Sequence, residues 1–88
     1  MWNAGFAAMP RADKEWIERV KRLLKAELTR RDVSYRELAE RLERIGVTGS
    51  TERNISNRIS AGGFSAAFFF QCMEAIGAKT IHLDRDDD

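Results

Sequence analysis

The chain alternates apolar and polar residues with the period of an α-helix in four separate stretches. The first follows Asp13, whose side chain suits the N-cap position, and it predicts a helix over about 14–31. Basic residues gather near its end, where the helix dipole favours positive charge. One stripe of this helix is expected to face the core: Trp16, Ile17, Val20, Leu23, Leu24 and Leu28.

The second stretch predicts a helix over about 35–45. Ser34 and Glu37 form an S-x-x-E capping box at its start, and Val33 and Leu38 stand at the hydrophobic staple positions. A glycine follows the last apolar position, and it can end the helix because it adopts left-handed backbone geometry at little cost.

The third stretch predicts a shorter helix over about 51–61. Either Ser50 or Thr51 can serve as its N-cap, since both hydroxyls accept hydrogen bonds from helix N–H groups. The glycine pair Gly62–Gly63 is expected to end it.

The fourth stretch predicts a helix over 66–76, capped by Ser65 and ended by Gly77. Phe64 and Phe69 stand at staple positions around the cap. The following segment, KTIHL, predicts a short strand or an extended segment.

Together these elements predict an all-α, four-helix domain with a short extended C-terminal segment, spanning 13–83. Residues 1–12 are expected to form a flexible N-terminal arm. Residues 84–88, with four Asp, are expected to form an acidic disordered tail.

Composition narrows the class of protein. The chain has 88 residues and one Cys, which excludes an internal disulfide and favours a reducing, cytoplasmic compartment. We expect no membrane span, because no apolar run reaches about 18 residues, and no signal peptide in MWNAGFAAMPR. The net charge is +1, but without 84–88 the chain carries 14 basic and 10 acidic residues. This modestly basic body is compatible with nucleic-acid binding.

The third predicted helix has an unusual outer face. Only Ile55 and Ile59 can anchor it to a core, and the opposite side carries Asn, Ser, Arg and Ala. Asn and Ser weaken helices, whereas a solvated helix face usually carries Glu and Lys. Two interpretations stay open: a solvated surface helix, or a helix that reads bases, since Asn pairs with adenine and Arg with guanine.

The order of elements is that of a helix-turn-helix domain. VSYRELAERLERIG resembles the first motif helix of the Cro/phage-repressor (XRE-like) family, and NISNRISAGGFSAAFFFQCMEAIGAKTI resembles that family's recognition helix and the helix after it. From about Trp16 to Leu83 the chain is more closely similar to a family of short bacterial proteins of unknown function. The repressor resemblance implies sequence-specific double-stranded DNA binding in bacterial transcriptional regulation, with 51–61 as the recognition helix.

The chain departs from the repressor pattern between its motif helices. Glu43 stands where that pattern has Gly, and 16 residues separate Ala39 from Ile55, so the turn is about six residues longer. The docking angle of the recognition helix therefore does not carry over.

Candidate DNA contacts follow from the resemblance, position by position. Phosphate contacts set affinity and base contacts set sequence preference. The base-reading candidates are Ser50, Thr51, Arg53, Asn54 and Asn57. The phosphate candidates are Arg58, Arg36, Lys21 and Lys25.

The fourth predicted helix is apolar around nearly its whole circumference. One interpretation places all of its Phe residues in the core, under the first helix and the arm with Trp2 and Phe6. The other is a homodimer interface, where aromatics and Met are enriched; its candidate residues are Phe68, Phe70, Met73 and Ile81. An alternative function is a protein–protein interaction module, or antitoxin-like partner, that uses helix 66–76 without DNA binding.

Enzymatic chemistry is not expected. Cys72 and His82 stand ten residues apart with no further Cys or His, so no zinc set is available. Cys72 lies among Phe and Met, which indicates a core residue rather than a nucleophile. We expect no catalytic residues, no metal, no cofactor and no small-molecule ligand.

Overall fold

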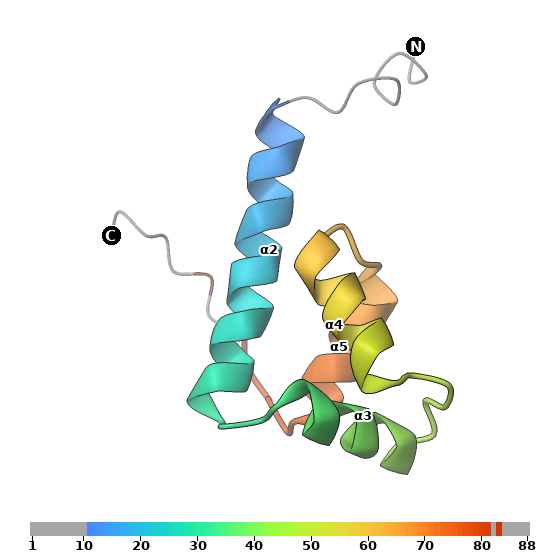
Figure 1. The fold of residues 1–88 in the computed structure, drawn as a ribbon. Helices are drawn as coiled ribbons and strands as arrows, with labels where there is room; N and C mark the ends of the chain where they lie inside the picture. The colour runs from blue at the N-terminus through green and yellow to red at the C-terminus, as the bar shows by residue number, and fades with distance from the viewer. Residues whose placement is uncertain (1–10, 82, 84–88) are drawn as a thin grey trace.

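The structure, a computed structural model, describes residues 11–81 and Leu83, and only the backbone of residues 11 and 12. Four helices follow one another: α2 (Arg11–Arg30), α3 (Tyr35–Arg44), α4 (Glu52–Ala61) and α5 (Ala66–Ala75) (Figure 1). The predicted all-α, four-helix class is confirmed. No strand occurs in the part of the chain that the structure describes, where Ile81 has irregular backbone.

The predicted arm and tail lie almost entirely outside the described residues. Helix α2 begins at Arg11, inside the range 1–12 that we assigned to the arm. Trp2, Phe6, His82 and the segment 84–88 are not among the described residues.

Three helix starts match the capping pattern, whereas the prediction that Asp13 caps the first helix is wrong, because Asp13 lies within the first turn of α2. Ser34 accepts a hydrogen bond from the Glu37 N–H at 3.1 Å, and Ser65 accepts one from the Phe68 N–H at 3.0 Å. Thr51 rather than Ser50 caps α4, because its hydroxyl oxygen accepts from the Asn54 N–H at 3.1 Å. The caps therefore fix where three of the four helices begin.

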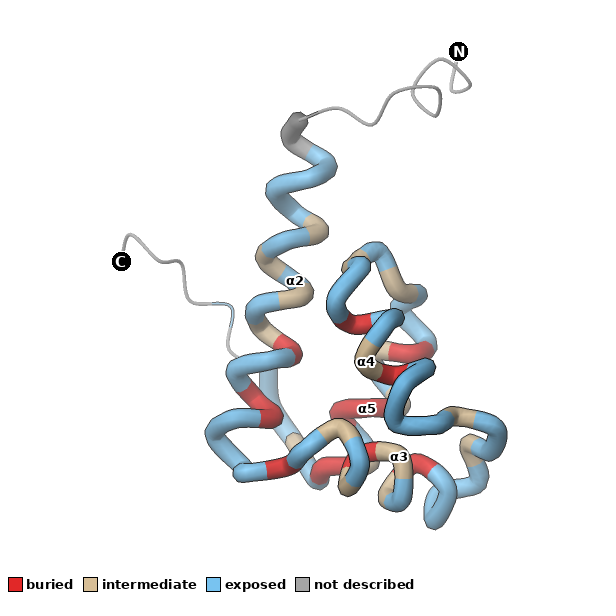
Figure 2. The backbone as a smooth tube through the Cα atoms, viewed as in Figure 1, coloured by how far each residue is buried: buried red, intermediate tan, exposed pale blue. Residues whose placement is uncertain are grey.

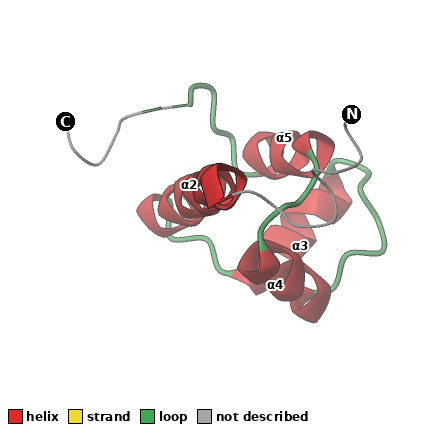
Figure 3. Ribbon diagram, turned by 90° about the horizontal axis from the view of Figure 1, so that it is seen from above, coloured by secondary structure: helices red, strands yellow, loops and turns green. Residues whose placement is uncertain are grey.

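A single core lies where the helices meet (Figure 2). Helix α3 packs against both α4 and α5, and α2 closes the core from one side (Figure 3). The largest fully buried side chains of the core come from every described helix: Leu24, Leu38, Leu42, Ile55, Ile59 and Cys72. Burial of such side chains stabilises a fold by roughly 1.5–3 kcal/mol each.

The predicted apolar stripe of α2 is only partly correct. Leu24 and Leu28 are buried, but Trp16 is 60 % exposed and Val20 40 % exposed. The N-terminal half of α2 projects beyond the other helices (Figure 1). Gly62 lies against Ile17 in this half, and Leu83 borders the same hollow as Trp16 and Val20, but Trp16 and Val20 remain largely exposed.

Helices α2 and α4 approach closely at one point. Lys21 donates a hydrogen bond from Nζ to the Ser60 carbonyl oxygen at 2.8 Å, near the C-terminal end of α4. Gly62 follows with φ 74° and ψ −174°. A Cβ at this position would lie 2.8 Å from Cγ2 of Ile17, so only glycine lets the chain pass α2 here.

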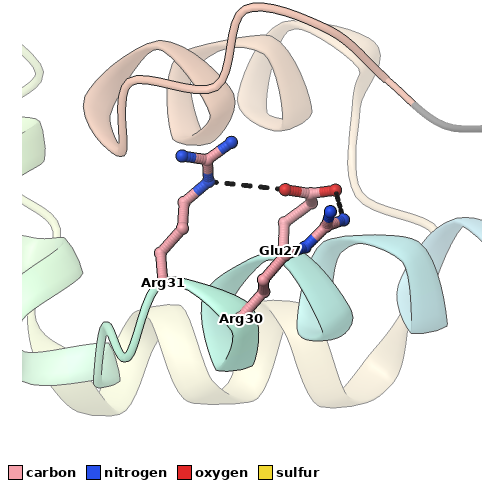
Figure 4. Close-up of polar contacts among 3 residues, drawn as sticks. All are labelled: Glu27, Arg30 and Arg31. Carbon is pink, nitrogen blue, oxygen red and sulfur yellow. Dashed lines mark hydrogen bonds and ion pairs between the residues drawn. The ribbon is translucent and has the colours of Figure 1, made fainter.

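One carboxylate is buried among the apolar side chains. Glu27 is 2 % exposed, and it forms ion pairs with Arg30, in the last turn of α2, and with Arg31, which follows the helix (Figure 4). A buried charge needs such partners because losing its hydration is costly.

Candidate nucleic-acid interface

The outer face of α4 is open to solvent. Ile55 and Ile59 are fully buried in the core and hold the helix there, where α4 packs against α3. Arg53, Asn54 and Asn57 are exposed on the other side. Because the buried isoleucines occupy one face, the arginine and the two amides stand on the part of the helix turned away from the core.

The two residues at the start of α4 differ in position. Thr51 is exposed, and its hydroxyl caps the helix while keeping an O–H that can donate to a phosphate. Ser50 is half-buried and lies before the cap, in the turn. The structure therefore groups four of the five predicted base-reading residues on or beside the open face, and it places Ser50 at its margin.

Arg58 is held by an aromatic ring. Its guanidinium carbon lies 4.5 Å from the centre of the Phe68 ring, and Phe68 is itself buried. A guanidinium stacked on a ring keeps its N–H groups available at the edge of the plane. Arg58 remains exposed, so the stacking fixes a positive group beside the open face of α4.

Lys21 joins α2 to α4. Its ammonium group donates to the Ser60 carbonyl and lies 3.7 Å from Oε2 of Glu18, and its side chain is 20 % exposed. A cation at the C-terminal end of a helix satisfies free carbonyls and the dipole. The predicted phosphate contact of Lys21 stays a prediction.

Lys25 and Arg36 are exposed, but they belong to the junction of α2 and α3. Lys25 lines a shallow hollow together with Tyr35 at the start of α3. Neither residue has a described contact with α4, so the structure does not bring them together with the predicted base-reading residues.

The turn between α3 and α4 is as long as the spacing predicts. It runs over 45–51 and begins with a helix end at which the Val47 N–H donates to the Leu42 carbonyl at 2.9 Å. Val47 packs against the core and fastens the turn.

Two residues of the predicted dimer interface are core residues. Phe68 is 3 % exposed and Met73 is 4 % exposed within the single chain, because α5 packs them against the other helices. They are corrected from interface to core. Phe70 is 68 % exposed and Ile81 is 45 % exposed, so only these two reach the surface.

Cys72 is a buried thiol. Its side chain is fully buried, and burial raises its pKa to about 12, while the positive charge of Arg58 opposes that rise. A thiol with this pKa stays neutral, which suits its predicted role as a core side chain.

Two features of the surface were not predicted from the sequence. The stacking of Arg58 on Phe68 joins residues ten positions apart on two helices, and no local pattern indicates it. The exposed part of α2 carries Trp16 and Val20 on a spacing separate from that of Ile17, Leu24 and Leu28. The sequence contains this second spacing, but the prediction assigned the residues of both spacings to one apolar stripe.

The family comparison covers this surface and the helices that hold it. The family model described as a domain of unknown function (DUF6471) matches residues 16–81. The chain belongs to the DUF6471 family. All of α3, α4 and α5 lie inside the matched range, so the open face of α4 is part of the DUF6471 domain itself.

No curated protein and no solved structure matches this chain. Membership of the DUF6471 family therefore indicates no activity for this chain. The resemblance to repressors stays a hypothesis. Among the described residues, no helix combines the length and apolar character that crossing a membrane requires.

Proposed function

We propose that this DUF6471 domain binds double-stranded DNA sequence-specifically in the bacterial cytoplasm, as a regulator of transcription, with α4 as the recognition helix. One observation supports this most strongly. Arg53, Asn54 and Asn57 are exposed on one face of α4, while Ile55 and Ile59 on the other face are fully buried.

The chemistry of this face suits the major groove. The amide of Asn57 can pair with adenine and the guanidinium of Arg53 can pair with guanine, each through two hydrogen bonds. Helix α4 has 10 residues and is about 15 Å long. An α-helix with its side chains is about 10–12 Å in diameter, so it fits the major groove, which is about 12 Å wide.

Positive charge at the edge of α4 supports docking onto the phosphate backbone. Arg58 stands there with its guanidinium ordered by Phe68, so less side-chain entropy is lost when it meets a phosphate. The uncapped N–H groups at the start of α4, beside Thr51, offer a second phosphate site.

A regulator of this size is expected to act as a homodimer. Two copies would present two α4 helices to half-sites about one helical turn of DNA apart. Doubling the phosphate contacts also raises the affinity of a small, weakly charged domain.

The test measures binding to random-sequence duplex DNA across a series of salt concentrations. We expect the logarithm of affinity to fall linearly with the logarithm of salt concentration. Arg58→Ala should reduce the slope by about one and weaken all sequences alike. Arg22→Ala removes the same charge from an exposed position on α2 and is the matched control, with the smaller effect.

Absence of binding even at low salt would contradict the proposal. In that case the interaction-module alternative remains, with Phe70 as the exposed aromatic residue of α5 that could meet a partner.

A further inference from the structure

Helix α2 carries a second seam, separate from the one that enters the core. Positions 13, 16, 20, 23, 27 and 30 recur at alternating spacings of three and four, which is the spacing of a coiled-coil contact stripe, although Glu27 at the fifth of them is buried within the chain. On this seam Trp16 is 60 % exposed, Val20 is 40 % exposed and Leu23 is half-buried. The buried residues of the same helix are Leu24, Glu27 and Leu28, and Leu23 packs partly against the core.

A hollow follows this second seam on the surface. Trp16, Val20 and Leu23 line it together with Leu83 from the C-terminal segment. Apolar side chains gathered along one exposed helix face mark a surface that another helix can cover.

We propose that a second copy of this chain covers the seam, and that the two α2 helices pack side by side in antiparallel orientation. The two-fold axis lies between residues 21 and 22. Val20 then packs on the partner's Leu23, and Leu23 packs on the partner's Val20. This surface lies on α2 rather than on α5, and the proposal does not depend on DNA binding.

Charge along the seam selects the antiparallel orientation. In that register the carboxylate of Asp13 at one end meets the guanidinium of the partner's Arg30. A parallel pair would instead place Asp13 against a second Asp13 and Arg30 against a second Arg30. Like charges that face each other across an interface are unfavourable.

The contact between Trp16 and the partner helix, which lies between the centre and the end of the helix pair, is also complementary. Trp16 would lie beside the partner's Arg30, whose side chain is 56 % exposed. A guanidinium over an indole ring is a favourable contact. Arg19 already stacks on Trp16 within one chain, at 4.6 Å from the ring centre, which orders the indole before association.

The first test measures the oligomeric state by sedimentation velocity as a function of protein concentration. We expect the wild-type chain to dimerise and Val20→Glu to raise the dimer dissociation constant by about a hundredfold or more, because it buries an unpaired charge. Phe70→Glu is the matched control, since it places the same charge at an exposed apolar residue of α5. It should leave the dissociation constant unchanged.

Three results would overturn the proposal. One is a wild-type chain that stays monomeric at all concentrations. Another is a Val20→Glu variant that dimerises like the wild type. The third is a dimer lost in Phe70→Glu, which would move the interface to α5. Circular dichroism of each variant shows that the helices are intact.

The second test measures the orientation by distances between nitroxide labels. Arg22→Cys and Thr29→Cys place labels seven residues apart, on the same side of α2 outside the seam. In an antiparallel pair the two labels at 22 lie at nearly the same height, whereas those at 29 are offset by about 22 Å along the axis. The distance at 29 should therefore be clearly longer, and equal distances would contradict the antiparallel arrangement. Cys72 is fully buried and does not compete for the label.

Discussion

Replacing Gly62 with Ala tests the packing that sets how α4 is presented. The backbone at Gly62 has φ 74° and ψ −174°, a region that is essentially restricted to glycine and costs other residues about 1–3 kcal/mol. The added Cβ would also lie 2.8 Å from Cγ2 of Ile17, which is closer than Cβ atoms approach. Ile17 is β-branched and stiff, so the overpacking adds about 1–3 kcal/mol.

The two contributions together predict that Gly62→Ala lowers the free energy of unfolding by about 2–6 kcal/mol. A domain of this size has about 5–15 kcal/mol in total, so the melting temperature should fall by at least about 8 °C. Urea unfolding followed by circular dichroism at the helix band measures the change directly.

Two further variants separate the backbone contribution from the contact. Gly63→Ala also has positive φ, 66°, but its Cβ would meet nothing within 4 Å, so it should cost only about 1–2 kcal/mol. Ile17→Ala removes the opposing methyl group, so Gly62→Ala should cost about 1 kcal/mol less in that background. Equal costs for the two glycine variants, with no coupling to Ile17, would refute the close approach of α4 to α2.

Three other predictions follow from single contacts. Lys21→Met keeps the side-chain stem but removes the hydrogen bond to Ser60, so urea unfolding should show that the free energy of unfolding falls by about 0.5–1.5 kcal/mol. An unchanged free energy of unfolding would contradict a stabilising role of this hydrogen bond. Arg58→Ala removes the stacking on Phe68 and should cost about 0.5–2 kcal/mol in the same assay, an effect that high salt does not abolish. Cys72, with its pKa raised to about 12 by burial, should resist a thiol reagent at pH 8 until urea is added, and rapid native labelling would contradict its burial. Because the unfolded thiol ionises near 9 and the folded one near 12, stability should fall as pH rises between these values.

Local patterns predicted the helices well, because capping and helix-ending signals act over a few residues. Ser34 and Ser65 cap the helices that they were predicted to cap, and Thr51 was one of two candidates for α4. The staple pair Phe64 and Phe69 is also present, with the rings stacked 6.5 Å apart.

Features that depend on how helices meet were not predictable in the same way. The sequence shows that Lys21 is basic, but only the approach of α4 to α2 makes it a cap for Ser60. Likewise α5 is apolar on every side, and the packing alone decides that Phe68 is buried and Phe70 exposed. Because the turn before α4 is long, the sequence alone did not determine whether Arg53 and Asn57 are exposed, and the packing of the helices shows that they are.

The most direct measurement of the proposed base reading is selection of bound sequences from a random pool of duplex DNA. We predict enrichment of a short motif, and loss of preference at one position of it in Asn57→Ala, at a cost of about 1–3 kcal/mol for that base. Arg36→Ala, which changes an exposed residue away from α4, should keep the motif. A pool without any enriched sequence, or a motif that survives in both Arg53→Ala and Asn57→Ala, would show that the outer face of α4 does not read DNA.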